Sequence, residues 1–289
     1  MRLLTRELLA QLQQLHIHSR RRLRYQYRGE RSGLRKGSSL EFSDYREYLP
    51  GDDIRSIDWN VYARTDRLFL KLFLEDESKP VYFVLDASDS MNFGDPTKFE
   101  YSRAFALALS YVSLLNYDQP RILIVQNDSF QSIRLPSIRQ FFSIVRQMES
   151  VKTGGETKWS AALKKIALAG LPKGIYFLLS DFHSIDGWDG MKLLAAAGNE
   201  LHCLQTLTSE ELEPSLRGDL RLIDSETKAD SEVSISPSVL KRYQFRLRKM
   251  QEELKASAFH SFASFSLIQT SVPLQTLLLR DLRKTGVLS

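Results

Sequence analysis

From residue 80 onward, short apolar runs typical of buried strands alternate with segments of helical periodicity. We expect strands at 81–85, 121–126, 129–135, 175–180, 201–207 and 264–270. We expect helices at 98–115, 137–149, 158–169, 188–197 and 273–284, and a further one that begins at Ser236-Pro237. Asn127-Asp128 indicates a hairpin between two of the strands. The alternation predicts an α/β fold, with a mostly parallel central sheet and helices on both faces.

The residues before this region follow another pattern. Residues 3–15 predict an amphipathic helix with four leucines on one face, and 68–74 predict a strand. We therefore expect three parts: a basic N-terminal helix and arm at 1–37, a small β-containing segment at 38–79, and the main domain at 80–289.

Positive charge is concentrated in the first 37 residues, which hold ten Lys and Arg against two Glu. The rest of the chain holds 30 basic and 33 acidic residues. Such an arm is either a solvated helix end or a contact surface for nucleic acid, an anionic membrane or an acidic partner. Because the rest of the chain lacks a nucleic-acid motif, we expect only weak, salt-sensitive nucleic-acid binding.

Membrane insertion and secretion are not expected. No apolar stretch approaches the roughly 20 residues that cross a bilayer, and the N-terminus does not look like a signal peptide. The single cysteine, Cys203, excludes a disulfide within the chain and a cysteine-rich zinc site. We therefore expect a cytoplasmic protein.

Side chains that carry oxygen follow several predicted strands, where open α/β sheets bind their ligands. An aspartate and two serines occupy alternate positions after strand 81–85. A threonine follows a glycine pair at a helix start, and another aspartate ends strand 175–180. Taken alone, the first string also fits a turn or a helix cap. Mg²⁺ prefers such oxygen ligands, so together they predict a site for Mg²⁺ or Mn²⁺. The five candidate ligands are Asp86, Ser88, Ser90, Thr157 and Asp181.

These five positions resemble the metal-ion-dependent adhesion site (MIDAS) of von Willebrand factor type A domains, although Glu156 is inserted before the threonine. A second motif lies upstream. It resembles the signature of the bacterial "domain of unknown function fifty-eight" family, whose members pair this segment with a type A domain. The likeness covers about 29–289, and the motif reads Tyr48-x-Pro50-Gly51-Asp52-Asp53-x-Arg55-x-Ile57-Asp58-Trp59, then Ala63-Arg64.

The resemblance implies a magnesium- or manganese-binding module that is not an enzyme. A protein partner would supply an acidic side chain to the bound metal. The resemblance further implies that this partner is a MoxR-type AAA ATPase, and that the pair assists the maturation or assembly of other proteins. Since Asp86 follows a strand in a loop, we expect its loss to remove a metal ligand without harming the fold.

Two other interpretations stay open. A phosphatase-like hydrolase would use Asp86 as its nucleophile, but Ser88 stands where such enzymes usually carry a second, acid-base aspartate. In segment 48–64, the charged side chains form either an ion-pair network or an acid-base site, and neither a nucleophile nor a histidine accompanies them. We favour the network, anchored by Ile57 and Trp59. Its members are expected to be Asp52, Asp53, Arg55, Asp58 and Arg64.

Overall fold

The computed structural model describes residues 3–19, 41–50, 52, 54, 57–74, 78–183, 187–215, 218–223 and 230–289. The chain divides into two compact units, one formed by 1–24 with 79–289 and the other by 25–78. The N-terminal helix therefore belongs with the main unit, whereas the sequence suggested that it forms a separate arm with residues up to 37.

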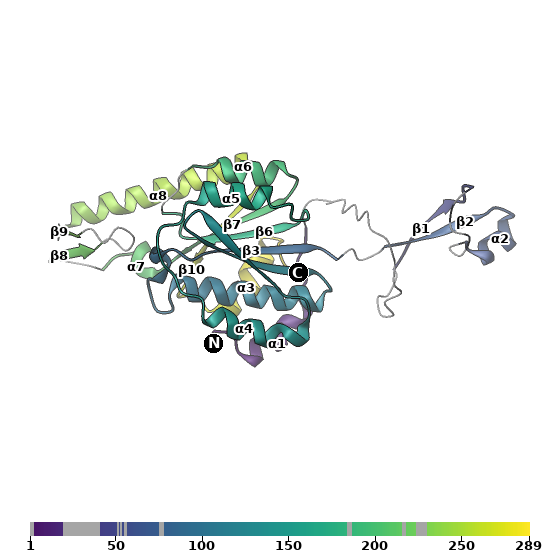
Figure 1. Ribbon diagram of the computed structural model, residues 1–289, viewed down its shortest axis with the longest axis horizontal. Coiled ribbons are helices and arrows are strands. Elements are labelled where there is room, and N and C mark those ends of the chain that lie inside the picture. Colours follow the sequence, from purple (N-terminus) through teal and green to yellow (C-terminus); the bar gives the residue numbers. More distant parts are fainter. Residues whose placement is uncertain are drawn as a thin grey trace. The chain divides into compact units, whose positions relative to one another are not determined.

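A six-stranded sheet forms the centre of the main unit (Figure 1). Its strands are β3 (Pro80–Asp86), β4 (Gln119–Gln126), β5 (Ser129–Arg134), β6 (Ile175–Ser180), β7 (Glu200–Leu207) and β10 (Ser264–Gln269). The spatial order is β10-β7-β6-β3-β4-β5, and all neighbours are parallel except β4 and β5. All six predicted strands are confirmed, as are the mostly parallel sheet and the hairpin.

Helices cover both faces of this sheet (Figure 1). Helices α3 (Lys98–Leu115) and α4 (Phe141–Glu149) lie on one face; α5 (Trp159–Leu168), α6 (Asp189–Ala196) and α8 (Pro237–His260) lie on the other. Alternate residues of β3 enter the two cores: Phe83 packs on the α3 side and Tyr82 on the α5 side. Both β3 and β6 are buried along their whole length, which explains their continuous apolar sequences.

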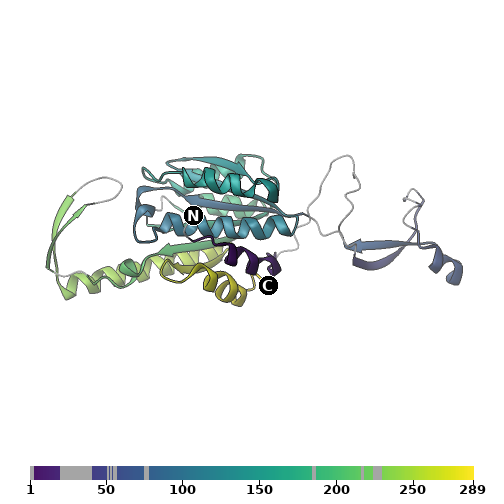
Figure 2. The same cartoon turned by 90° about the horizontal axis from the view of Figure 1, so that it is seen from below.

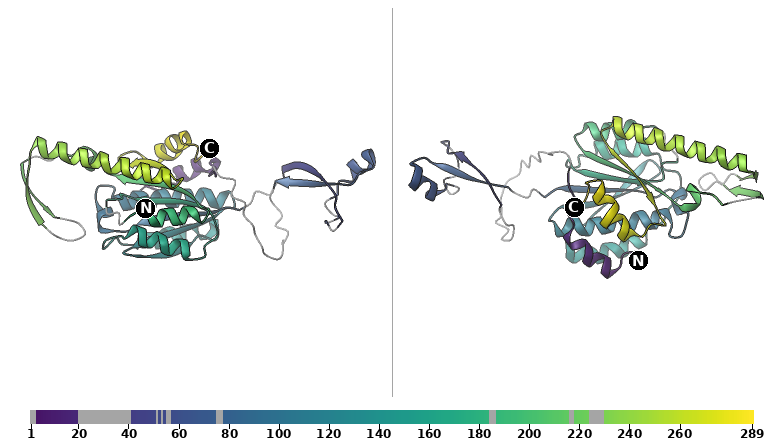
Figure 3. Two further views of the ribbon diagram at one scale, coloured as in Figure 1. Left: turned by 90° about the horizontal axis from the view of Figure 1, so that it is seen from above. Right: turned by 180° about the vertical axis from the view of Figure 1, so that it is seen from behind.

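Both ends of the chain pack on the α3 face. Helix α1 (Arg6–Gln11) continues as a 3₁₀ turn (Leu12–Gln14), and its leucines join the core. The N-terminal and C-terminal segments lie side by side (Figures 2 and 3), and backbone hydrogen bonds join His16 to Ser289. The predicted C-terminal helix is interrupted: α9 (Leu274–Thr276) and α10 (Leu282–Lys284) flank a π-helical turn (Leu277–Asp281).

The remaining elements of the main unit are short. They are 3₁₀ turns at Asp89–Asn92 and Ile138–Gln140, helix α7 (Ser209–Leu212), and the antiparallel hairpin of β8 (Gly218–Ile223) and β9 (Asp230–Ile235). This hairpin was not predicted from the sequence. Among the residues described, no helix is both long enough and apolar enough to span a membrane.

The second unit contains β1 (Glu41–Glu47), which pairs antiparallel with β2 (Phe69–Leu74), and α2 (Trp59–Thr65). This confirms the small β-containing segment. Asp58 begins α2, because its carboxylate accepts hydrogen bonds from the backbone N–H groups of Asn60 and Val61. The same carboxylate accepts a hydrogen bond from the Tyr45 hydroxyl at 2.9 Å.

The expected ion-pair network of this unit is found only in part. Asp52 pairs with Arg46 at 2.8 Å, and this contact lowers the pKa of Asp52. Arg64 donates to the backbone oxygen of Asn60. Asp53 and Arg55, like Gly51, lie outside the described residues. Ile57 is buried as expected, but Trp59 is 60% exposed, so the prediction of a tryptophan anchor is wrong.

Candidate functional site

The strand order places two candidate ligands next to each other. When the six strands are numbered 1 to 6 in chain order, their order in the sheet is 3-2-1-4-5-6, which is the doubly wound order. The first half of the chain adds strands on one side of β3 and the second half adds them on the other, so the switch point lies between β3 and β6. Asp86 ends β3, and Asp181 directly follows β6. Ligands of such sheets bind at this switch point, beyond the carboxyl ends of the strands.

All five candidate ligands meet there, around one small polar pocket. Ser88 and Ser90 hold their hydroxyl oxygens 3.0 Å apart, and the Thr157 hydroxyl lies 2.7 Å from Asp86 Oδ1. Two residues that the sequence analysis did not name, Trp159 and Ser180, complete the lining. The full lining is Asp86, Ser88, Ser90, Thr157, Trp159, Ser180 and Asp181.

Two backbone hydrogen bonds bring Thr157 to this pocket. Gly154 N–H donates to Ala87 O at 2.8 Å, and Asp89 N–H donates to Gly155 O at 2.9 Å. Gly155 has a φ of +74°, and a Cβ there would lie 2.6 Å from Asn127 Oδ1, so the turn requires glycine. The inserted Glu156 is exposed while Thr157 is buried. The insertion thus leaves the threonine oriented toward Asp86.

Neutral donors hold the Asp86 carboxylate. Its Oδ1 accepts from Ser88 N–H and the Thr157 hydroxyl, at 2.9 and 2.7 Å. Its Oδ2 accepts from the Ser180 hydroxyl and Trp159 Nε1–H, at 2.5 and 3.1 Å. Burial and the nearby charge of Asp181 raise the pKa of Asp86, and the hydrogen bonds offset this only in part. Asp86 is thus fixed in place without a balancing positive charge.

A buried lysine holds the Asp181 carboxylate. Lys98 Nζ, at the first residue of α3, lies 2.7 Å from Asp181 Oδ2 and 2.5 Å from Glu211 Oε1. Its side chain is only 1% exposed. Burial alone would lower the pKa of Lys98, but the two carboxylates raise it, so the ammonium stays charged. Asp181 therefore has its counter-ion built into the fold.

Glu211 links this ion pair to α7. Burial would raise the pKa of Glu211, but contacts with His183 and Lys98 lower it to about 2. Its second oxygen caps α7 through the backbone and hydroxyl of Thr208. Asp181, His183 and Glu211 have a spacing that suits a metal ion. Lys98, however, already contacts both carboxylates.

Sequence reasoning missed Lys98 and Glu211. The position of Lys98 carried a usable signal, because the helix after the first strand begins at the same edge of the sheet where that strand ends. Glu211 carried a weaker one, since it follows the carboxyl end of β7 by a few residues. Ser180 precedes a predicted ligand, and Trp159 lies two residues after another. The sequence alone, however, does not indicate that either side chain faces Asp86.

The fold and site together define a doubly wound α/β protein with an oxygen-rich pocket at the switch point. The family model described as "Protein of unknown function DUF58" matches residues 44–253, so the chain belongs to this family. As predicted, the chain is a DUF58 protein, and its main unit is an α/β fold with a mostly parallel sheet.

Curated relatives include the uncharacterized protein Rv1480 of Mycobacterium tuberculosis and the uncharacterized protein Mb1516 of Mycobacterium bovis. Each is 25% identical over 239 residues, which cover 81% of this chain and 75% of the relative.

Solved structures with a similar architecture include the conserved hypothetical protein BatB from Bacteroides thetaiotaomicron. It is 14% identical, and the alignment covers 72% of this chain and 99% of that chain with a TM-score of 0.43. Another is the SpRpn10 VWA domain, which is 11% identical over 69% of this chain and 92% of that chain, with a TM-score of 0.39.

Proposed function

We propose that this protein is a metal-dependent protein-interaction module that binds one Mg²⁺ or Mn²⁺ in the pocket between β3 and β6. The observation that carries the proposal is the convergence of three hydroxyls and two carboxylates on one pocket at the switch point. The pocket's candidate ligands are all hard oxygen donors, which suits these cations and not a soft metal.

The charges around the pocket support a role in binding an acidic partner. Lys98 balances Asp181, so Asp86 is the carboxylate left to face a cation. A divalent ion held by Asp86 and neutral hydroxyls keeps a net positive charge. A partner's aspartate or glutamate would complete its coordination through a charge-assisted contact.

A hydrolase using Asp86 as nucleophile is less well supported. Both oxygens of Asp86 already accept hydrogen bonds from four donors within the fold. No acid-base group stands at the Ser88 position, since a serine hydroxyl does not act as an acid near neutral pH. These contacts favour a carboxylate that is held in place over one that attacks a substrate.

The proposed partner is a MoxR-type AAA ATPase, with which the protein would assist the maturation or assembly of other proteins. This part of the proposal comes from the family resemblance, whereas the expected cytoplasmic location comes from the apolar patterning and the single cysteine of the sequence. Nucleic-acid binding through the basic residues of 1–37 stays a prediction, because 20–37 lie outside the described residues.

Calorimetric titration with MgCl₂ and MnCl₂ tests the metal site through two matched variants of Thr157. Thr157→Val keeps the shape and removes the oxygen, whereas Thr157→Ser keeps the oxygen and removes a methyl group. We expect one divalent site in the wild type, affinity within a few-fold of it in Thr157→Ser, and a loss of about tenfold or more in Thr157→Val. Equal affinity in both variants would remove Thr157 from the site.

Capture of the purified ATPase tests the partner. Immobilised wild type should retain the MoxR-type ATPase of the same organism in MgCl₂ and release it in chelator. Thr157→Val should retain less of it, and Thr157→Ser as much as the wild type. Undiminished capture in chelator would mean that the metal pocket is not the contact surface.

A further inference from the structure

Within the described part of the chain, the sheet ends at β10, whose backbone groups on one side have no strand partner. Among the described strands, β10 pairs only with β7. At the end of that pair, Thr270 N–H donates to Leu207 O at 2.9 Å. Backbone N–H and C=O groups alternate sides along a strand. The groups of Ile268 and Ser266 therefore face β7, and those of Phe265 and Leu267 face the open edge.

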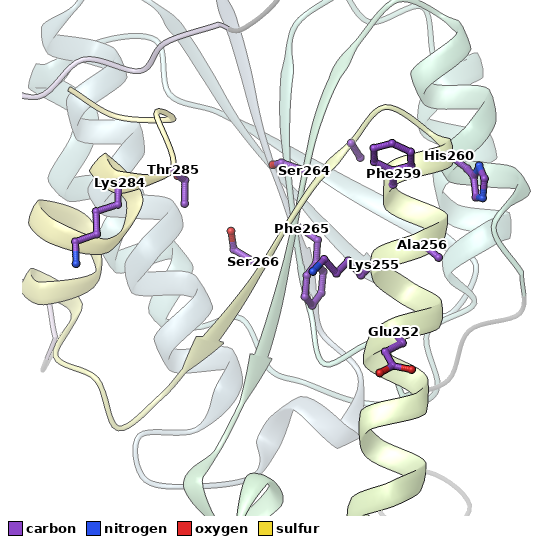
Figure 4. Close-up of a pocket in the computed structure, with 11 residues that line it drawn as sticks. Glu252, Lys255, Ala256, Phe259, His260, Ser264, Phe265, Ser266, Lys284 and Thr285 are labelled. Atoms are coloured by element: carbon purple, nitrogen blue, oxygen red, sulfur yellow. The ribbon is translucent and has the colours of Figure 1, made fainter.

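A groove of about 790 Å³ runs along this edge (Figure 4). β10 lies between α8 and the C-terminal segment, which form its two walls. The α8 wall includes Lys255, Glu252 and Phe259, a residue that is 77% exposed, and the opposite wall includes Lys284. A strand added beside β10 would thus have a hydrogen-bonding floor, an apolar contact and a lysine on each side.

The charge of the walls identifies the occupant. The groove itself is lined by two lysines, Lys255 and Lys284, against one glutamate, Glu252. Helix α8 as a whole carries six Lys and Arg against two Glu, and all of these charged residues are exposed. A second copy docked edge to edge would bring two such basic helices together, which like-charge repulsion disfavours. An extended segment with acidic side chains matches both the backbone groups and the charge.

We infer that the open edge of β10 binds an extended acidic segment of a partner protein, which joins the sheet as a seventh strand. In this mode of recognition, main-chain hydrogen bonds supply affinity and alternate side chains supply specificity. The inference goes beyond the metal-dependent module and does not rest on it, since β7 separates β10 from β6.

The test uses a fluorescent peptide of alternating valine and aspartate, with a valine-lysine peptide as the charge control. Leu267→Pro removes one outward N–H, and the residue's groups take no part in the ladder with β7. Edge strands tolerate proline at such positions. Leu267→Ala keeps the N–H and serves as the matched control. The double variant Lys255→Glu with Lys284→Glu changes the walls and leaves the strand intact.

We expect the aspartate peptide to bind the wild type and Leu267→Ala alike, as measured by fluorescence anisotropy. Leu267→Pro and the double-lysine variant should each bind it about tenfold more weakly. Both should keep the wild-type circular dichroism, and the lysine peptide should bind none of the proteins. No binding of the aspartate peptide, or equal binding by the double-lysine variant, overturns the inference. So does a wild-type dimer in sedimentation that Leu267→Pro dissociates, because the occupant is then a second copy.

Discussion

Asp86 and Asp181 hold equivalent places at the ends of the neighbouring strands β3 and β6, yet the groups around them differ in kind. Four uncharged donors surround Asp86: two hydroxyls, an indole N–H and a backbone N–H. Asp181 instead forms an ion pair with Lys98, which a second carboxylate, Glu211, shares. Both aspartates are buried.

The difference separates two tasks. Dipolar donors orient a carboxylate without cancelling its charge, so Asp86 stays able to attract a cation. An ammonium cancels the charge of Asp181, and the same lysine ties the start of α3 to the end of β6 and to α7. By this comparison, Asp86 serves metal binding and the Asp181–Lys98–Glu211 cluster serves the stability of the empty site.

Removal of Lys98 should have the largest effect on stability. Lys98→Met leaves Asp181 and Glu211 buried without their cation, and losing one partner of a buried ion pair costs about 3–5 kcal/mol. We expect this loss in urea unfolding measured in chelator. Added Mn²⁺ should restore part of the stability, because Asp181, His183 and Glu211 are spaced to hold a metal once the lysine is gone.

The control for this variant is Lys164→Met, which removes an exposed lysine that pairs with Asp189 at 3.8 Å. It should change the free energy of unfolding by less than about 1 kcal/mol, and added Mn²⁺ should stabilise it no more than it stabilises the wild type. If the two variants behave alike, Lys98 is not the counter-ion that the geometry indicates.

Asp86→Ala should have the next largest effect. The sequence led us to expect an intact fold, because Asp86 follows a strand in a loop. The structure changes this expectation, since alanine would leave three buried donors without an acceptor, while Trp159 Nε1–H keeps only its contact with Ser180 Oγ. We expect a loss of about 3 kcal/mol in urea unfolding. Asp128→Ala, which removes an exposed ion pair with Lys165, should cost less than about 1 kcal/mol. A similar cost in both would show that these three donors find other acceptors.

The inner strands β3, β6 and β7 were predictable because they are buried on both faces, which requires continuous apolar runs such as 81–85 and 175–180. The candidate ligands were predictable because each lies at the end of a strand or within a few residues after a strand or a glycine turn. Such signals are local, so they can be read along the chain. The β8–β9 hairpin has no continuous apolar run, since its apolar residues alternate with polar and charged ones.

The counter-ions could not be predicted in the same way. Lys98 contacts Asp181 and Glu211, which lie 83 and 113 positions away in the sequence. A contact between residues so far apart leaves no periodic pattern within either segment from which it could be predicted. The prediction that Trp59 is buried was wrong for another reason. A large apolar residue was assumed to be an anchor, although apolar side chains also occur on protein surfaces.

Glu211→Gln should have a smaller effect, because it removes one of the two negative charges that contact Lys98 and keeps the other. Lys98 remains paired with Asp181, so the expected loss is only about 1–2 kcal/mol in urea unfolding. The double variant Lys98→Met with Glu211→Gln tests the coupling. Its cost should be less than the sum of the single costs, because the buried negative charge that Lys98→Met leaves behind is halved. Additive costs would place Glu211 outside the cluster.

Ser90→Ala separates metal binding from stability and should have the smallest effect on the fold. The Ser90 side chain is half-buried and contacts the Ser88 hydroxyl at 3.0 Å, while no hydrogen bond to Asp86 is lost. We expect the free energy of unfolding in chelator to change by less than about 1 kcal/mol. The Mn²⁺ affinity should nevertheless fall about tenfold in calorimetry, because one oxygen ligand is missing. Ser90→Thr, which restores a hydroxyl, should recover most of that affinity. An unchanged affinity in Ser90→Ala would remove this serine from the metal site and leave Asp86, Ser88 and Thr157 to supply the ligands.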